Sequence, residues 1–200
     1  MRRVSYKELK ELALNAKYAI WDSARSANRD VKIYLHWSAG RYNSTFGSYH
    51  INITGDGSIY VSTDDFNERL SHTYYRNTGA VGIVLCCAYN ATTQDLGEYP
   101  PTAAQIEAMA KVGCILADAW DLTIDKLRVM THGEAADNED GLTPHEEYGP
   151  RTTCERWDLE YLGTDESPSF NPWAEDGSRG GDVLRGKMNW YRNTGIAELK

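Results

Sequence analysis

The segment Val31-Lys32-Ile33-Tyr34-Leu35-His36 alternates apolar and polar residues and ends in a histidine. Such alternation is typical of a β-strand that turns its apolar side chains to one face and His36 to the other. The segment Leu127-Arg128-Val129-Met130-Thr131-His132 alternates in the same way and also ends in a histidine. If these are neighbouring strands of an α/β sheet, both imidazoles emerge near its carboxyl edge, where such sheets bind ligands. With Asp158, which follows later in the chain, they predict a zinc site at that edge.

The composition favours one sizeable domain. The chain has 200 residues, of which 41% are hydrophobic and 25% charged, as is typical of a soluble globular protein with a substantial core. We expect a domain over residues 1–163 and an extension over 164–200 that packs on it. The longest apolar stretch, residues 80–88, is too short to cross a bilayer. The first ten residues lack the apolar core of a secretory signal, so we expect synthesis in the cytoplasm without ordinary export.

Charge and cysteine content narrow the range of partners. The net charge is −8 and no run of lysine and arginine exceeds two residues, which argues against nucleic acid or an anionic membrane as a partner. The four cysteines show no Cys-x-x-Cys spacing, so we expect reduced and mostly buried thiols. We also expect a monomer.

Helical patterns occur near the start and in the middle of the chain. Apolar residues at helical spacing follow a candidate N-cap at Ser5 and predict a helix over 6–26, within a leading segment 1–30. Thr102 is expected to cap a second helix that reaches Trp120. Two alternating segments, 48–54 and 58–62, flank Gly55-Asp56-Gly57 and predict a β-hairpin.

Other segments complete the predicted element order. The nearly continuous apolar run 80–88 predicts a central strand buried on both faces. Residues 133–153 are polar and are expected to form a loop. Further on, short helices are expected over 155–162 and over 183–191.

The order of the motifs carries more information than any one of them. The chain contains, in sequence, His-x-Ser-Ala, Ser-Tyr-His-Ile-Asn-Ile-x-x-Asp-Gly-x-Ile-Tyr, Leu-Ser-His, Asn-x-x-Ala-Val-Gly-Ile, Thr-His-Gly-Glu and Arg-Trp-Asp. This order closely resembles the zinc-dependent N-acetylmuramoyl-L-alanine amidases over about residues 32–162. The resemblance implies the fold shared by phage lysozyme-type amidases and peptidoglycan recognition proteins: one α/β domain with a central mixed sheet flanked by helices, here with a C-terminal appendage.

The resemblance also implies a metal site and a reaction. It assigns His36, His132 and Asp158 as zinc ligands, with a fourth position left for water. Cys154 remains the alternative third ligand, because a thiolate also binds zinc. Family members cleave the amide between the lactyl group of N-acetylmuramic acid and the L-alanine of the peptide stem. Peptidoglycan or muropeptides would therefore be the partner, in phage or prophage lysis or in recycling of wall fragments.

Two further residues are matched to catalytic positions. Tyr49 corresponds to a catalytic tyrosine near the zinc-bound water in phage-type members, although it would otherwise be read as packing a hairpin face. His50, its neighbour, is expected to be structural. Arg156 stands where the family usually has a lysine that stabilises the oxyanion, and a guanidinium keeps that positive charge. Its structural alternative is a surface ion pair with a nearby glutamate.

The general base and the groove are less well defined. Some members use a glutamate on the central strand, but Val84 occupies that position here. The nearest acidic residue that could act as the general base instead is Glu134. Its structural alternative is to cap a loop. His72 and Trp37 are expected to bind substrate.

Three functions fit these observations. The first is a zinc amidase. The second is a peptidoglycan-binding module of the same fold without hydrolysis, and the third is a structural virion component derived from an amidase. Because binding-only relatives usually lose the third ligand, the complete set of candidate ligands favours the enzyme.

Overall fold

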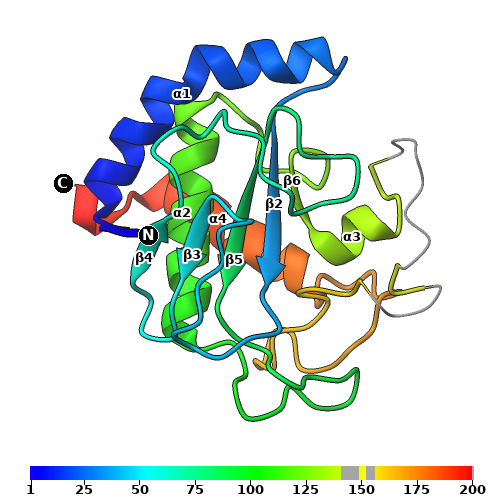
Figure 1. Cartoon of the computed structure of the whole chain (residues 1–200). Coiled ribbons are helices and arrows are strands. Elements are labelled where there is room, and N and C mark those ends of the chain that lie inside the picture. Colours follow the sequence, from blue (N-terminus) through cyan, green and yellow to red (C-terminus); the bar gives the residue numbers. More distant parts are fainter. Residues whose placement is uncertain (141–148, 152–155, 200) are drawn as a thin grey trace.

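The computed structural model describes residues 1–140, 149–151 and 156–199 (Figure 1). Its centre is a six-stranded sheet made of β1 (Arg2–Val4), β2 (Lys32–Trp37), β3 (Ile51–Ile53), β4 (Ile59–Val61), β5 (Ala80–Leu85) and β6 (Val129–Thr131). The strand order is β1-β4-β3-β5-β2-β6. β5 is parallel to β2 and β3, and β6 is parallel to β2, whereas β4 is antiparallel to β1 and β3. The expected α/β fold with a central mixed sheet is confirmed.

The two central strands, β2 and β5, are buried along their whole length. A strand covered on both faces can be apolar throughout, which explains the continuous apolar run at β5. The hairpin of β3 and β4 lies where its Gly-Asp-Gly turn predicts it, with Gly57 at φ 81°. The strand β1 was not anticipated, because three residues are too few to show a periodicity.

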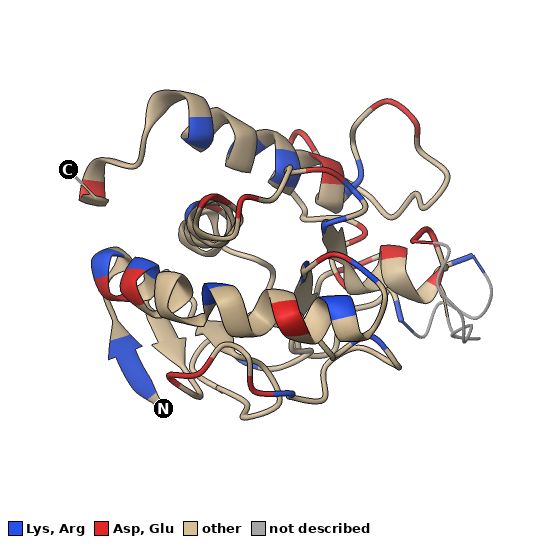
Figure 2. Cartoon of the chain, turned by 90° about the horizontal axis from the view of Figure 1, so that it is seen from above, with Lys and Arg blue, Asp and Glu red and all other residues tan. Residues whose placement is uncertain are grey.

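Two long helices begin and end close to their predicted bounds. α1 (Tyr6–Ser26) is capped by Ser5, and α2 (Ala103–Ala119) is capped by Thr102. Both caps are capping boxes, in which the residue three positions on, Glu8 or Gln105, bonds back to the backbone of the cap. α2 contacts both α1 and the long helix near the C-terminus, α4 (Gly180–Thr194). Seen from above, α2 lies between these two helices (Figure 2).

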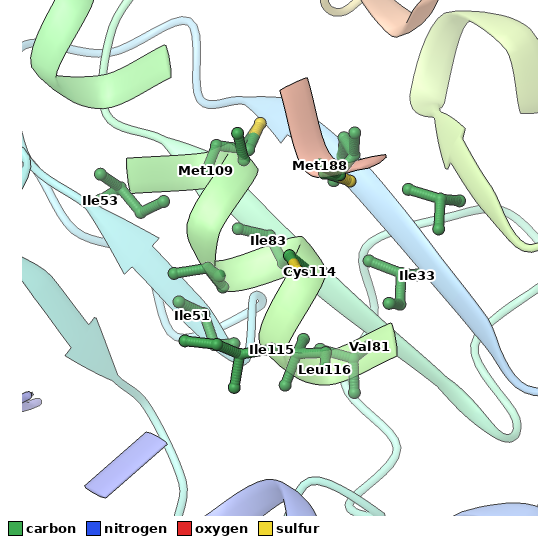
Figure 3. Close-up of a cluster of buried hydrophobic side chains, with 14 of the residues drawn as sticks. Ile33, Ile51, Ile53, Val81, Ile83, Met109, Cys114, Ile115, Leu116 and Met188 are labelled. Carbon is green, nitrogen blue, oxygen red and sulfur yellow. The ribbon is translucent and has the colours of Figure 1, made fainter. Parts of the chain in front are cut away.

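The main core lies between one face of the sheet and the helices α2 and α4. Figure 3 shows isoleucines of β2, β3 and β5 facing apolar residues of α2 and Met188 of α4. Met188 packs directly over Gly113, where an added Cβ would lie 2.4 Å from the methionine Cε. Leu184 is also fully buried in this core, so residues from the expected extension 164–200 pack inside the main core. A short 3-10 helix, η1 (Ala197–Leu199), follows α4.

The segment after β6 differs from the prediction. His132 does not end a strand but begins α3 (His132–Ala136), and the rest of this helix falls in the stretch 133–153 that was expected to be a loop. The reason is local: Thr131 and Glu134 form a capping box, which starts a helix immediately after β6. Residues 156–162 are not helical, so the expected helix over 155–162 is wrong for its described part. Glu155, the start of that helix, lies outside the described residues.

Two general expectations can be compared with the described residues. Cys86, Cys87 and Cys114 are buried free thiols, as expected, while Cys154 lies outside the described part of the chain. Within the described ranges, no helix combines the length and the apolar character needed to cross a membrane.

Candidate metal centre and adjoining pocket

Three side chains from distant parts of the chain converge at the carboxyl edge of the parallel strands. His36 lies near the end of β2, and His132 follows β6 directly. Because Leu35 pairs with Thr131, the two histidines occupy the next position on each chain, and their ring centroids are 4.8 Å apart. Asp158 approaches from a non-helical segment. Its Oδ2 is 3.4 Å from His36 Nδ1 and 3.3 Å from His132 Nδ1.

This donor set fits a zinc ion. One ligand atom from each of the three residues lies within 4.8 Å of the others. Imidazole nitrogen and carboxylate oxygen both bind zinc at about 2.0–2.2 Å, and such ligands around a tetrahedral ion stand about 3.3 Å apart. The separations from Asp158 to the two imidazoles match that spacing. Three protein ligands would leave one position open, as in catalytic zinc sites.

Charge at the centre favours an ionised carboxylate. Burial raises the pKa of Asp158, but the attraction of His132 and hydrogen bonds from both histidines outweigh it and hold the pKa below its usual range. The Asp158 carboxylate is therefore negative at neutral pH. This is the form that binds a metal cation.

Tyr49 and His72 complete one wall around His36. The Tyr49 ring is centred 5.0 Å from that of His36, and the His72 ring 5.3 Å from it. Burial, followed by the charge of Asp158, raises the pKa of Tyr49 far above neutrality. The phenol therefore keeps its proton and is suited to donating a hydrogen bond. Thr73 links the wall together, since its Oγ1 lies 2.9 Å from His72 Nδ1 and 3.4 Å from His36 Nε2.

His72 occupies its position because β5 has a glycine beneath it. A Cβ added at Gly82 would lie 2.7 Å from His72 Cγ. Burial, and then the neighbouring imidazoles, hold the pKa of His72 well below its usual value, so the ring is neutral. His50 is structural, as expected: its Nε2 donates to the Glu68 carbonyl and its Nδ1 accepts from the Gly82 N–H.

A cavity of about 600 Å³ adjoins His132 and His72. Arg156 lines this cavity. Three exposed residues also line it, namely Arg69, Tyr74 and Tyr75. The two tyrosine rings contact each other edge to face at 4.6 Å. Sequence reasoning missed these three residues. The signal available was the pair Tyr74-Tyr75, one residue after Leu-Ser-His. The exposure of this pair could not be deduced, because the segment is short and irregular.

His72, His132 and Arg156 are the predicted site residues that line this cavity, and Tyr49, His36 and Asp158 lie beside it around the candidate metal centre. Trp37 and Glu134 belong to neither group. Trp37 is only 5% exposed and packs edge to face against Trp157 and Tyr161 within the core. Glu134 is fully buried, and both its carboxylate oxygens accept hydrogen bonds from Arg185. Burial raises the pKa of Glu134, but Arg185 outweighs it and lowers the pKa below its usual value. These surroundings do not support Glu134 as a proton acceptor for the reaction.

Comparison with known proteins gives two similarities. A family model described as N-acetylmuramoyl-L-alanine amidase matches residues 15–156, more than half of the chain. A solved structure, the endolysin N-acetylmuramoyl-L-alanine amidase LysCS from Clostridium intestinale URNW, is 20% identical over 52% of this chain and 68% of that chain, with a TM-score of 0.39. Among curated proteins, none matches the chain.

Proposed function

The chain belongs to the N-acetylmuramoyl-L-alanine amidase family, which acts on peptidoglycan, and from this premise we propose that it is a zinc-dependent enzyme. Its reaction is hydrolysis of the amide between the lactyl group of N-acetylmuramic acid and the L-alanine of the peptide stem. The observation that carries this proposal is the convergence of His36, His132 and Asp158 beside an open cavity.

Each ligand supplies a donor suited to zinc, namely imidazole nitrogen from the histidines and carboxylate oxygen from the aspartate. Held by these residues, a zinc ion would supply a Lewis acid that lowers the pKa of water and polarises a carbonyl. The protein then has to orient the amide, exclude competing water and stabilise the charge that develops on the carbonyl oxygen.

Two side chains beside the centre are suited to that task. Tyr49, which keeps its proton, donates a hydrogen bond to the reacting amide. Arg156 lines the cavity and brings a fixed positive charge to the developing oxyanion. Among the described residues that line the cavity there is no aspartate or glutamate. We therefore assign the role of general base to groups at the metal centre, and Glu134 does not take this role.

The substrate side is supported by the shape and chemistry of the cavity. His72 and Thr73 form its floor next to His132, and Tyr74 and Tyr75 form an exposed rim. The side chains that line the cavity all carry a polar group, so they can form hydrogen bonds that orient a polar ligand. Within this proposal, His72 contacts the substrate, whereas Trp37 supports the wall from within the core.

The test combines metal content with cleavage. The purified protein is expected to bind about one zinc ion and to release stem peptides from wall fragments. His132→Ala is expected to lose both properties, whereas the exposed control Asp165→Ala keeps them. If His132→Ala retained zinc and cleavage, the ligand assignment would be wrong. If the wild-type protein bound wall fragments without cleaving them, the binding-module alternative would replace the enzyme.

A further inference from the structure

An ion pair between Arg185 and Glu134 joins α4 to the segment that carries His132, and we call this pair the first clamp. Glu134 lies two residues after this histidine, and Arg185 of α4 donates from Nη1 and Nη2 to its two carboxylate oxygens, both at 2.8 Å. Arg185 Nη1 also donates to the Val129 carbonyl at 3.0 Å. The Thr131 N–H donates to the same glutamate at 2.9 Å. A single guanidinium therefore fixes the chain on both sides of His132.

A second clamp joins the start of α4 to the segment that carries Asp158. Glu160 lies two residues after this aspartate and is buried. Arg179 donates to it from Nε at 3.0 Å and from Nη2 at 2.8 Å, while its Nη1 donates to Glu139 at 2.7 Å. The Gly180 N–H also donates to the Glu160 carbonyl at 3.1 Å. Arg179 thus ties the Asp158 segment to Glu139, which lies three residues after the end of α3.

Glycines at the contacts make room for both carboxylates. A Cβ at Gly181 would lie 2.7 Å from Glu134 Oε1, and a Cβ at Gly133 would lie 2.6 Å from Glu160 Oε1. At Gly180 a Cβ would lie 2.0 Å from the Leu159 carbonyl oxygen. The backbone of α4 therefore approaches both ligand-bearing segments as closely as the chain allows.

The location of α4 makes these clamps unexpected. α4 passes behind β5 and β2, with its amino-terminal end toward the side of the sheet that carries α3 (Figure 1). It lies entirely beyond residues 15–156, the part of the chain that matches the amidase family model. Bidentate arginine–carboxylate pairs are geometrically specific, and buried charges persist only where they are paired. Two such pairs, one from α4 and one from its N-cap residue Arg179, each hold a glutamate that lies two residues after a candidate ligand.

We infer that Arg179 and Arg185 are positioning residues for the metal centre, acting through Glu160 and Glu134 on Asp158 and His132. The inference rests on the proposed zinc site. In this account, α4 belongs to the binding machinery, and Glu134 serves as an anchor for the metal-bearing segment. When a residue that does not bind the metal but orients its ligands is replaced, metal affinity typically falls by about 10–100-fold.

The experiment measures zinc affinity by competition with a chelator, independently of cleavage. Arg185→Gln and Arg179→Gln are each expected to weaken zinc binding by about 10–100-fold. Arg192→Gln is the matched control, because Arg192 lies on the same helix and pairs with exposed Asp118. Its zinc affinity is expected to equal that of the wild type. Arg185→Lys keeps the charge but not the two-pronged contact, and is expected to give an intermediate affinity.

A second control separates positioning from general loss of stability. Leu184→Ala opens a cavity beside Arg185 but leaves both clamps in place. It is expected to lower the melting temperature while keeping zinc affinity, measured well below that temperature. The inference is overturned if folded Arg185→Gln or Arg185→Lys binds zinc as tightly as the wild type, or if Leu184→Ala loses as much affinity as Arg185→Gln.

These outcomes are separate from those of the proposed reaction. If the wild type binds zinc and the arginine variants bind it equally tightly, the positioning role is rejected and the amidase proposal still stands. Weakened variants together with an inactive wild type support the positioning role and reject the reaction. A wild type without zinc affinity rejects both.

Discussion

The rings of His36 and His132 are centred 4.8 Å apart, yet they are held in different ways. His36 belongs to β2, a fully buried strand with a hydrogen-bonded neighbour on each side. His132 begins a five-residue helix after the edge strand β6, and Asp158 lies on a non-helical segment. We call His36, with Tyr49 and His72 around it, the sheet-held half of the site. We call His132 and Asp158 the α4-held half.

The two halves therefore depend on the rest of the chain in different ways. In the sheet-held half, His36 is positioned by the backbone hydrogen bonds between β2 and its two neighbouring strands, and Tyr49 and His72 pack around it from irregular segments. The α4-held half is positioned by two particular guanidinium groups from a distant helix. Substitutions far from the metal should therefore affect the α4-held half more than the sheet-held half.

The largest effects are expected from removing a ligand, and they should be equal in the two halves. His36→Ala and Asp158→Ala are each expected to lower zinc affinity by more than the about 10–100-fold typical of replacing a residue that only orients a ligand, and to leave no measurable cleavage. Metal analysis after dialysis checks this. Cys154→Ser is the control and is expected to retain zinc. The reverse result, loss in Cys154→Ser and retention in Asp158→Ala, would make the thiolate the third ligand.

The next largest effect sharpens the chemistry of the sheet-held half. Tyr49→Phe keeps the ring that contacts His36 but removes the hydroxyl donor. We expect kcat to fall by about 10²–10³-fold, as for loss of one oxyanion donor, with zinc content unchanged. Steady-state kinetics on a soluble muropeptide measures this. Unchanged kcat would show that the phenol takes no part in the reaction.

A smaller effect tests the packing of the sheet-held half. Gly82→Ala places a Cβ 2.7 Å from His72 Cγ, against a ring held between β5 and Thr73. We expect a loss of about 1–3 kcal/mol in the free energy of unfolding, as for other overpacked sites. Thermal or denaturant unfolding measures it. Gly47→Ala is the matched control, since a Cβ there meets nothing within 4 Å. Equal stability of the two variants would refute the close packing of His72.

The smallest effect concerns the charge beside the α4-held half. Arg156→Lys keeps the positive charge that lines the cavity and restores the residue usual in the family. We expect cleavage to stay within about tenfold of the wild type, whereas Arg156→Ala should lose considerably more. Comparing kcat of the two variants tests this. Equal losses would mean that the guanidinium acts through its shape and not through its charge.

The sequence predicts the local parts of this structure well. The capped helices α1 and α2, the hairpin and the strands β2 and β5 all follow from periodicity and capping within a few residues of each element. The convergence of His36 and His132 also follows, because parallel neighbouring strands bring their ends together.

The remainder depends on contacts between distant residues. The Thr-His-Gly-Glu motif contains the capping box that begins α3, but the strand-like alternation before it favoured a strand through His132. Glu134 is the nearest acid in sequence, yet its partner Arg185 is 51 residues away. Trp37 follows a candidate ligand, but its ring packs into the core. In each case the deciding partner lies on another element that no local pattern identifies.

Zinc-dependent cleavage of the amide is tested by identifying the products of wall digestion with and without zinc. The protein is stripped of metal with a chelator, zinc is restored to one portion, and both portions are incubated with purified muropeptides and analysed by mass spectrometry. The account predicts free stem peptides beginning with L-alanine, together with peptide-free muramic acid, in the zinc-restored portion alone. Uncleaved muropeptides in both portions, or the same products in both, would contradict it.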